Sequence, residues 1–346
     1  MPESLGFSVY LSTFQDQWPL LSKWAHSSAP VFLSLNMGKG QGDPLEAEKI
    51  CRKLYEEGFR VIADVSTETC SLFEETDLLS LARRLGLWAL RIDYGFSPEE
   101  IAAMAEKMPI VLNASTTDPR DAKEILSGAG EIFALHNFYP RPETGLDEEL
   151  FLKTTRGLQA ALLKVLAFIP GDSQKRGPIF EGLPTLECHR NVLPSAAFAD
   201  LALTYGVDDI FVGDPGISEE EQRRIRLFCE ENILSVPADL EEDYAWLYGL
   251  TFTCRVDSPR WIIRLEESRT VHKIKNPPAP KGPEERSIGT ITMDNTAYGR
   301  YAGEIQILRE HLKPEERVNV IGHVPENAQL LLPIIGGGQK FRLVKP

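Results

Sequence analysis

The first two thirds of the chain alternate between short apolar runs and longer segments with helical character, and this alternation constrains the fold more than any other feature. Several runs are nearly continuous stretches of Val, Ile, Leu, Ala and Phe. Strands that are buried on both faces have this composition, which is typical of a parallel sheet. The eight runs occupy residues 6–10, 30–35, 59–65, 87–92, 110–113, 132–136, 162–169 and 209–212.

The segments between these runs begin with helix start signals. Asp43 and Ser97 are each followed by proline, the pattern of a cap before the first helical position. Acidic residues also mark the starts Asp118-Pro, Asp147-Glu-Glu and Ser218-Glu-Glu-Glu, where they suit the positive end of a helix dipole. Eight strand–helix units over roughly 235 residues match the usual size of a (β/α)8 barrel. The alternative is an open doubly wound sheet, but Tyr10-Leu-Ser-Thr-Phe is not the glycine-rich turn that would favour it. We therefore predict an α/β fold with a TIM barrel over residues 1–236.

The pattern changes after the polar stretch at residues 237–243. Short strand-like runs follow at residues 250–256, 261–265, 288–293, 303–308, 317–321 and 330–335, and the proline-rich residues 275–283 indicate an exposed loop. This pattern predicts a small antiparallel barrel or sandwich as a second domain, residues 237–346.

The overall charge limits the possible partners. The chain has 37 Lys and Arg against 51 Asp and Glu, for a net charge of −14. This excess of acid argues against binding to nucleic acid or an anionic membrane through bulk charge. An anionic small molecule would need a local basic pocket.

Cysteine usage and hydropathy indicate the compartment. The five scattered cysteines include no Cys-x-x-Cys spacing, which argues against a disulfide framework and a zinc knuckle. The longest apolar run, residues 158–170, is too short to span a bilayer and contains Lys164. The N-terminus lacks the basic and apolar regions of a secretory signal. We expect a cytoplasmic protein that needs no metal or cofactor, and the oligomeric state stays open.

Carboxylates follow the predicted strands where a barrel carries its chemistry. Asp64 and Asp93 come directly after apolar strands, and Glu181 lies on the long loop 170–191. Catalytic groups of such barrels gather at the carboxyl ends of the strands. Two carboxyls at this rim can divide into an acid and an ionised base or nucleophile. The alternative for each aspartate is that it caps the next helix or pairs with Arg91.

Candidate binding residues occupy the same loops. Arg141 and Arg190 offer bidentate donors for an anion, with a surface ion pair as the alternative. His136 is an acid–base group, a phosphate ligand or a satisfied core histidine. The turn at residues 213–216 precedes a helix whose N-terminus favours phosphate, although Asp214 would repel it. The full set is Asn113, His136, Asn137, Arg141, Glu187, His189, Arg190 and Asp214.

Eight strings that run in order along nearly the whole chain resemble a single family. They are GFSVY at 6–10, ADV at 63–65, LRIDYGF at 90–96, LNAST at 112–116, HNFYPRPETGL at 136–146, EGLPTLECHR at 181–190, GDP at 213–215 and DNTAYGRYAGE at 294–304. In these strings the chain resembles the bacterial MupG-type 6-phospho-N-acetylmuramidases.

The resemblance implies a TIM barrel followed by a cyclophilin-like β-barrel. It also implies cytoplasmic cleavage of a 6-phosphorylated N-acetylmuramyl-N-acetylglucosamine disaccharide during cell-wall recycling, with this small molecule as the partner. A β-glycosidase needs two carboxyl roles, and Asp64, Asp93 and Glu181 are the candidates for them. The 2-acetamido group of the substrate is an alternative nucleophile. The arginines, His136 and the turn at 213–216 would then bind the 6-phosphate and the lactyl carboxylate.

The second domain contributes one further candidate motif. Asn295, Tyr298 and Arg300 lie in a turn rich in hydrogen-bond donors, which either covers the barrel mouth or only packs the two domains together. Two other functions stay open: a phosphosugar epimerase or isomerase using Asp93 and His136, and a non-catalytic sugar-binding protein.

Overall fold

The computed structural model describes residues 2, 4–37, 42–92, 95–120, 122, 131–269 and 277–346. Contacts within the chain divide it into two units, Met1–Pro194 with Leu201–Gln222 and Ser195–Asp200 with Arg223–Pro346. Within the described ranges, no helix combines the length and the hydropathy needed to cross a bilayer.

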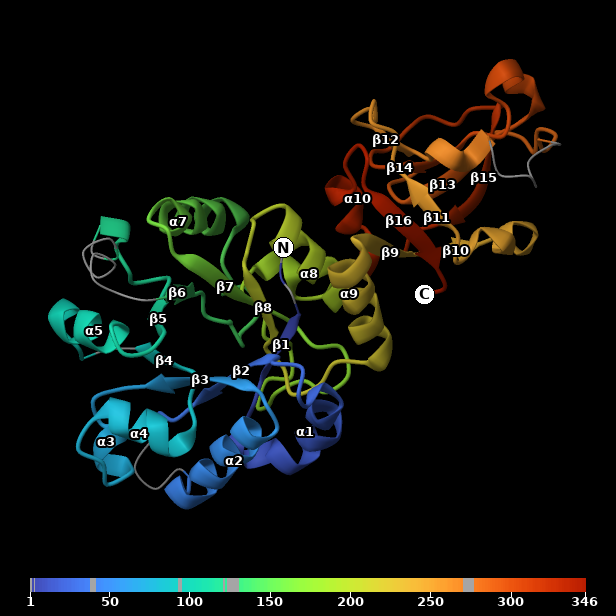
Figure 1. Cartoon of the computed structure of the whole chain (residues 1–346). Coiled ribbons are helices and arrows are strands. Elements are labelled where there is room, and N and C mark those ends of the chain that lie inside the picture. The colour runs from blue at the N-terminus through green and yellow to red at the C-terminus, as the bar shows by residue number, and fades with distance from the viewer. Residues whose placement is uncertain are drawn as a thin grey trace. The chain divides into compact units, whose positions relative to one another are not determined.

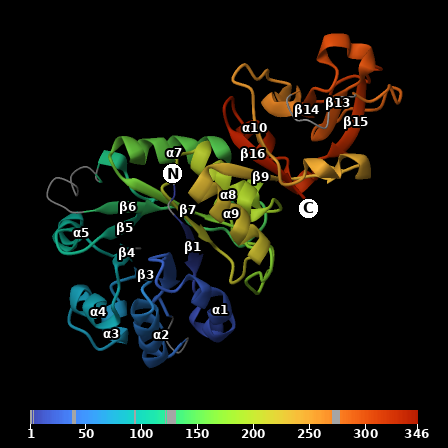
Figure 2. The same ribbon diagram turned by 45° about the vertical axis from the view of Figure 1, so that its right-hand side comes forward.

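Eight parallel strands form a closed barrel in chain order (Figures 1 and 2), and β1 closes it by pairing with β8. Every one of the predicted runs overlaps a strand, so the barrel is confirmed over the open sheet. The strands are β1 (Leu5–Ser8), β2 (Pro30–Ser34), β3 (Arg60–Val65), β4 (Ala89–Ile92), β5 (Ile110–Asn113), β6 (Ile132–Leu135), β7 (Lys164–Ile169) and β8 (Asp209–Val212).

The helices begin where the capping residues predict. The side chains of Asp43, Ser97 and Asp147 accept hydrogen bonds from backbone N–H groups in the first turns of α2, α5 and α7. Most of the segment expected to follow Asp118 lies outside the described residues. The helices before β9 are α1 (Phe14–Leu21), α2 (Pro44–Glu56), α3 (Thr69–Leu72), α4 (Leu78–Leu85), α5 (Pro98–Ala105), α7 (Glu148–Ala160), α8 (Pro194–Leu203) and α9 (Glu219–Glu231), with 3-10 turns η1 (Leu11–Thr13), η2 (Ser22–Trp24) and η3 (Glu187–His189).

Apolar side chains fill the barrel interior and set the position of the polar groups above them. Phe32, Ile62 and Ala89 belong to this buried cluster. Side chains alternate between the two faces of a strand, so the next inward position on each of these strands lies two residues further along. Those positions hold Ser34, Asp64 and Arg91, and the register pairs Ser34 with Asp64 and Asp64 with Arg91. A polar layer therefore begins where the apolar core ends, at the carboxyl ends of the strands.

The second unit contains two sheets. A five-stranded antiparallel sheet has the order β10-β15-β13-β14-β12, and a three-stranded sheet has the order β11-β16-β9, with β9 parallel to β16. No pairing between described strands closes these sheets into a barrel, so a cyclophilin-like barrel stays a prediction. The strands are β9 (Ile233–Pro237), β10 (Asp239–Leu240), β11 (Thr251–Thr253), β12 (Ile262–Arg264), β13 (Thr290–Asp294), β14 (Ile305–Leu308), β15 (Val318–His323) and β16 (Lys340–Val344). The 3-10 turns are η4 (Glu242–Leu247), η5 (Glu266–Arg269), η7 (Thr296–Tyr301) and η8 (Glu326–Ala328).

Two expectations for this unit are wrong. The run at 330–335 is not a strand, because it contains the helix α10 (Leu331–Ile334). Leu331, Leu332 and Ile335 are all buried, which is the spacing of one helix face. The arrangement is also not purely antiparallel, because β9 runs parallel to β16 and extends across the predicted domain boundary at residue 237.

Candidate active site at the barrel mouth

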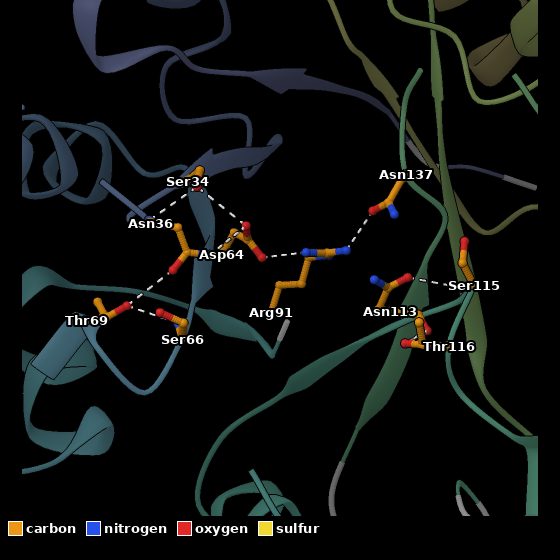
Figure 3. A network of polar contacts seen from close by, with 10 residues as sticks. All are labelled: Ser34, Asn36, Asp64, Ser66, Thr69, Arg91, Asn113, Ser115, Thr116 and Asn137. Carbon is orange, nitrogen blue, oxygen red and sulfur yellow. Dashed lines mark hydrogen bonds and ion pairs between the residues drawn. The ribbon is translucent and has the colours of Figure 1, made fainter. Parts of the chain in front are cut away.

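A buried ion pair lies at the carboxyl ends of β3 and β4 (Figure 3). Nη1 of Arg91 is 2.5 Å from Oδ1 of Asp64, and the two side chains are only 5% and 13% exposed. Nη2 of Arg91 donates to Oδ1 of Asn137, at 2.7 Å, in the loop after β6. One guanidinium therefore joins Asp64 and Asn137, two of the residues that the sequence analysis expected at this rim.

The second oxygen of Asp64 is held from the β2 side. Nδ2 of Asn36 donates to Oδ2 at 3.0 Å, and Oγ of Ser34 donates to the same atom at 3.4 Å. Oδ1 of Asn36 accepts a hydrogen bond from Oγ1 of Thr69, which fixes the orientation of the amide. Both carboxylate oxygens thus have donors, one of them cationic, and such donors stabilise the ionised form.

A cavity of about 580 Å³ opens beside this network. Its size is in the range of small-molecule sites. Ser34 and Asn36 line it and also bind Asp64, so the carboxylate borders the cavity through them. The other lining residues include Tyr10, Phe32, Phe138 and Arg176.

Tyr10 forms one wall of this cavity. Its hydroxyl donates to the backbone oxygen of Gly213, and burial raises the pKa of the phenol above its ordinary value. The guanidinium carbon of Arg176 lies 4.3 Å from the centroid of the Tyr10 ring. Ser34, Asn36 and Arg176 were not among the residues predicted from the sequence, although the alternation along β2 could have indicated Ser34 and Asn36.

Arg190 and Glu187 form a second ion pair, which we call the loop clamp. Nε and Nη2 of Arg190 lie 2.6 and 2.7 Å from the carboxylate of Glu187. Glu187 also accepts from the backbone N–H groups of Glu143 and Gly145, at 2.9 and 2.8 Å. The hydrogen bonds from Arg190 are the main cause that lowers the pKa of Glu187 to about 2. A Cβ at position 145 would lie 2.8 Å from the backbone nitrogen of Glu187, so only glycine fits there.

The loop clamp bears on two residues that were predicted to bind substrate, Arg190 and Glu187. The remaining donors of Arg190 reach backbone oxygens, among them those of Gly182 and Tyr139, both at 3.0 Å. Arg190 is 5% exposed. Its guanidinium is therefore fully engaged by the protein, so the contacts of Arg190 and Glu187 are structural and do not support the predicted anion-binding role of Arg190 or the predicted substrate-binding role of Glu187.

The turn after β8 is also occupied by protein groups. The buried carboxylate of Asp214 accepts from the backbone N–H groups of Gly171, Arg176 and Leu183, at 2.8, 3.0 and 3.0 Å. Burial raises the pKa of Asp214 despite these bonds. Near the start of α9, the N–H of Ser218 donates to Asp172 at 2.7 Å. Two carboxylates therefore already lie at this turn, and these contacts do not support the predicted phosphate site.

Neither candidate histidine lines the cavity. His136 is fully buried against α7, with Nε2 3.1 Å from Oγ1 of Thr155 and its ring 4.4 Å from that of Phe151. Burial lowers its pKa to about 4. His136 is thus a core histidine, in which Nε2 has a hydrogen-bond partner and the buried Nδ1 has none among the described residues. This position does not support the predicted acid–base or phosphate-binding role. His189 is likewise completely buried.

Other candidates stay predictions. Asp93 lies outside the described residues. Glu181 and Arg141 are exposed on their loops. Asn113 ends β5, and its Oδ1 accepts from the N–H of Ser115 at 3.0 Å (Figure 3).

In the second unit, Asn295 is a structural residue of its turn. Its Nδ2 donates to the backbone oxygen of Glu316 and to Oδ1 of Asn319, at 2.8 and 2.9 Å, and its Oδ1 accepts from Ala297. The amide is buried and satisfied, which supports the structural alternative for Asn295 rather than a contact with substrate.

Tyr298 and Arg300 lie in the same turn and stay predictions. Arg317 lies over the ring of Tyr298, with its guanidinium carbon 4.5 Å from the centroid. Arg300 is exposed and donates to the hydroxyl of Tyr301. In the part of the chain that the structure describes, no three His, Cys, Asp or Glu residues are grouped so as to hold a metal ion.

Comparisons with known proteins identify the family. The family models described as the N-terminal and C-terminal parts of 6-phospho-N-acetylmuramidase match residues 5–227 and 234–344. A conserved Enterococcus faecalis protein of unknown function is 34% identical with a TM-score of 0.85, over 99% of this chain and 96% of that one. An uncharacterized B. cereus protein is 26% identical with a TM-score of 0.81, over 100% of both chains. No curated protein sequence matches the chain significantly. The chain therefore belongs to the MupG-type 6-phospho-N-acetylmuramidase family.

Proposed function

We propose that this protein is a glycoside hydrolase that cleaves a 6-phosphorylated N-acetylmuramyl-N-acetylglucosamine disaccharide during peptidoglycan recycling in the cytoplasm. The observation that carries the proposal is the Asp64–Arg91 pair beside a cavity of about 580 Å³. The family matches over residues 5–227 and 234–344 supply the substrate class. The substrate is the only partner in the proposal, which includes no nucleic acid or membrane surface.

The arrangement at the mouth suits one of the two carboxyl roles of a glycosidase. Asp64 has donors on both oxygens, so it is held in one orientation and as a carboxylate. A fixed negative charge stabilises the oxocarbenium-like transition state, and the same group can act as base, as nucleophile or as the partner of the substrate's acetamide. Arg91 is the positioning residue, because it binds Asp64 and Asn137 at once.

The proton donor to the leaving oxygen must be a different group. Asp93 follows Arg91 by two residues in the sequence, and Glu181 lies on the loop after β7. We propose these two carboxyls as candidates for the acid. The barrel of residues 1–236 is the proposed catalytic domain. A cyclophilin-like fold in residues 237–346 would not by itself imply prolyl isomerase activity.

The geometry favours this function over the epimerase or isomerase. That alternative uses His136 for proton transfer, and His136 is buried against α7 with its pKa lowered to about 4. Such a histidine is neutral at pH 7 and has no contact with the cavity.

The test is incubation of the full chain with the phosphorylated and unphosphorylated muramyl disaccharides, followed by mass spectrometry. We expect the phosphorylated substrate to gain one water and separate into two sugars. Equal cleavage of both substrates would refute phosphate recognition. Release of neither sugar would refute the hydrolase and leave the non-catalytic sugar-binding protein.

A further inference from the structure

The proposed substrate carries anionic groups, but the buried arginines near the barrel mouth already serve the protein. Arg190 is bound by Glu187 and by backbone oxygens, and Arg91 by Asp64 and Asn137. The net charge of −14 provides no general attraction for an anion. Binding therefore requires a cation in the cavity itself.

Arg176, on the loop after β7, meets this requirement. It is exposed and lines the same cavity as Ser34 and Asn36, which hold Asp64. Of the carboxylates that the structure describes, none lies within ion-pair distance of its guanidinium, in contrast to Arg91 and Arg190. The planar donors of an arginine match phosphate and carboxylate oxygens.

Aromatic contacts hold this guanidinium at the cavity. Its carbon lies 4.3 Å from the centroid of Tyr10 and 5.9 Å from that of Phe138, and both rings line the cavity. The Tyr10 ring is itself fixed, because its hydroxyl donates to Gly213. A cation over an aromatic face keeps its charge while losing conformational freedom before the ligand arrives, which lowers the cost of binding.

The backbone of Arg176 is anchored as well. Its N–H donates to Oδ1 of Asp214 at 3.0 Å, and Oδ2 of Asp214 accepts from Gly171 and Leu183 of the same loop. Asp214, predicted from the sequence to bind substrate, thus positions the loop that presents Arg176. Asp43 and Glu46 also line the cavity, so an anion is attracted only at its Arg176 end.

We propose that Arg176 binds the anionic substituent of the substrate, with the ring of Tyr10 as its positioning platform. The inference rests on the proposed function for the identity of the substrate. The substituent is either the 6-phosphate or the lactyl carboxylate, and both offer the oxygens that a guanidinium binds.

The test measures binding to the full chain by calorimetry with four monosaccharides. N-acetylmuramic acid 6-phosphate carries both anions, N-acetylmuramic acid only the carboxylate, N-acetylglucosamine 6-phosphate only the phosphate, and N-acetylglucosamine neither. We expect Arg176→Met to lower the affinity for the doubly anionic ligand by about 10- to 100-fold. Arg176→Lys should lower this affinity less. Arg156→Met, which removes an exposed arginine of α7, is the matched control and should change nothing.

The singly charged ligands identify the bound group. If Arg176→Met loses affinity only for the phosphorylated ligands, Arg176 binds the phosphate. If it loses affinity only for the muramic acid ligands, Arg176 binds the carboxylate. An unchanged Kd for all ligands, an equal loss that includes N-acetylglucosamine, or no binding of N-acetylmuramic acid 6-phosphate by the wild type would overturn the inference.

Two further measurements separate the individual claims. Tyr10→Leu should weaken the binding of anionic ligands most, because it removes the ring over which the guanidinium lies. Tyr10→Phe keeps the ring but loses the hydroxyl bond to Gly213, so it should weaken binding less. Equal losses of affinity in both variants would contradict a role of the ring as the platform. Turnover of the disaccharide is scored independently of binding. Charge-dependent binding without turnover ends the hydrolase proposal alone, and turnover with an unchanged KM in Arg176→Met ends the Arg176 proposal alone.

Discussion

The barrel mouth and the loop clamp each contain a buried arginine bound to a carboxylate, but their surroundings differ. Arg91 and Arg190 have side chains that are 5% exposed in both cases. Arg190 uses its other donors on backbone oxygens of two loops, whereas Arg91 reaches the side chain of Asn137. The neighbours of each ion pair therefore distinguish their roles. The Arg190–Glu187 pair holds loops together, whereas the Arg91–Asp64 pair holds a carboxylate beside a cavity.

The largest expected difference between the two pairs is in activity. Asp64→Asn keeps the shape of the side chain and removes its charge. We expect kcat for the phosphorylated disaccharide to fall by about 10²- to 10⁴-fold, the usual contribution of a positioned catalytic group. Steady-state kinetics on protein shown to be folded by circular dichroism measures the effect. Turnover within a few-fold of wild type would make the mouth pair structural, like the loop clamp.

A substitution in the loop clamp should change the stability of the protein rather than its activity. Glu187→Gln leaves the buried charge of Arg190 without a counter-charge, so we expect the free energy of unfolding at pH 7 to fall by about 2 kcal/mol. Urea unfolding gives this value. A kcat loss as large as that of Asp64→Asn, with unchanged stability, would move Glu187 into the active site.

The same variant has a characteristic pH dependence. The pKa of Glu187 is lowered from 4.5 to about 2 in the folded chain. The carboxylate therefore contributes its full stability above about pH 5 and loses it as the pH falls toward 2. The difference in unfolding free energy between wild type and Glu187→Gln should shrink through this window. A constant difference would show that the charge of Glu187 is not what holds the loops.

A smaller effect tests the core assignment of His136. Burial lowers its pKa from 6.5 to about 4, so the unfolded chain takes up a proton in this interval and the folded chain does not. Its contribution to stability is complete above about pH 6.5 and is lost as the pH falls to 4. Relative to its value at pH 7, the stability of wild type should fall by about 1 kcal/mol more than that of His136→Phe at pH 5.5. Parallel pH profiles would contradict the buried neutral imidazole.

Much of the barrel could be predicted because strand burial leaves a direct pattern in the sequence. The runs at 110–113 and 209–212 coincide with β5 and β8. In the second unit, the run at 330–335 was ambiguous because a short buried apolar segment looks the same as strand or helix.

The site was harder to predict, because it depends on which way each side chain faces. Leu135 faces the barrel interior, and because side chains alternate along a strand, His136 faces the opposite way, toward α7. Asn137, one residue further along, faces the mouth again. The partners of Arg190 come from separate loops that no periodic pattern connects. Arg176 lies in a long irregular loop, where only the fold reveals that its side chain reaches Tyr10.

The most direct test of the central claim is a side-by-side assay of Asp64→Asn and Glu187→Gln on the 6-phosphorylated muramyl disaccharide. The account predicts that Asp64→Asn loses nearly all turnover while folded, and that Glu187→Gln keeps a kcat near wild type despite its lower stability. Full turnover by Asp64→Asn would contradict the assignment of the catalytic centre to the barrel mouth.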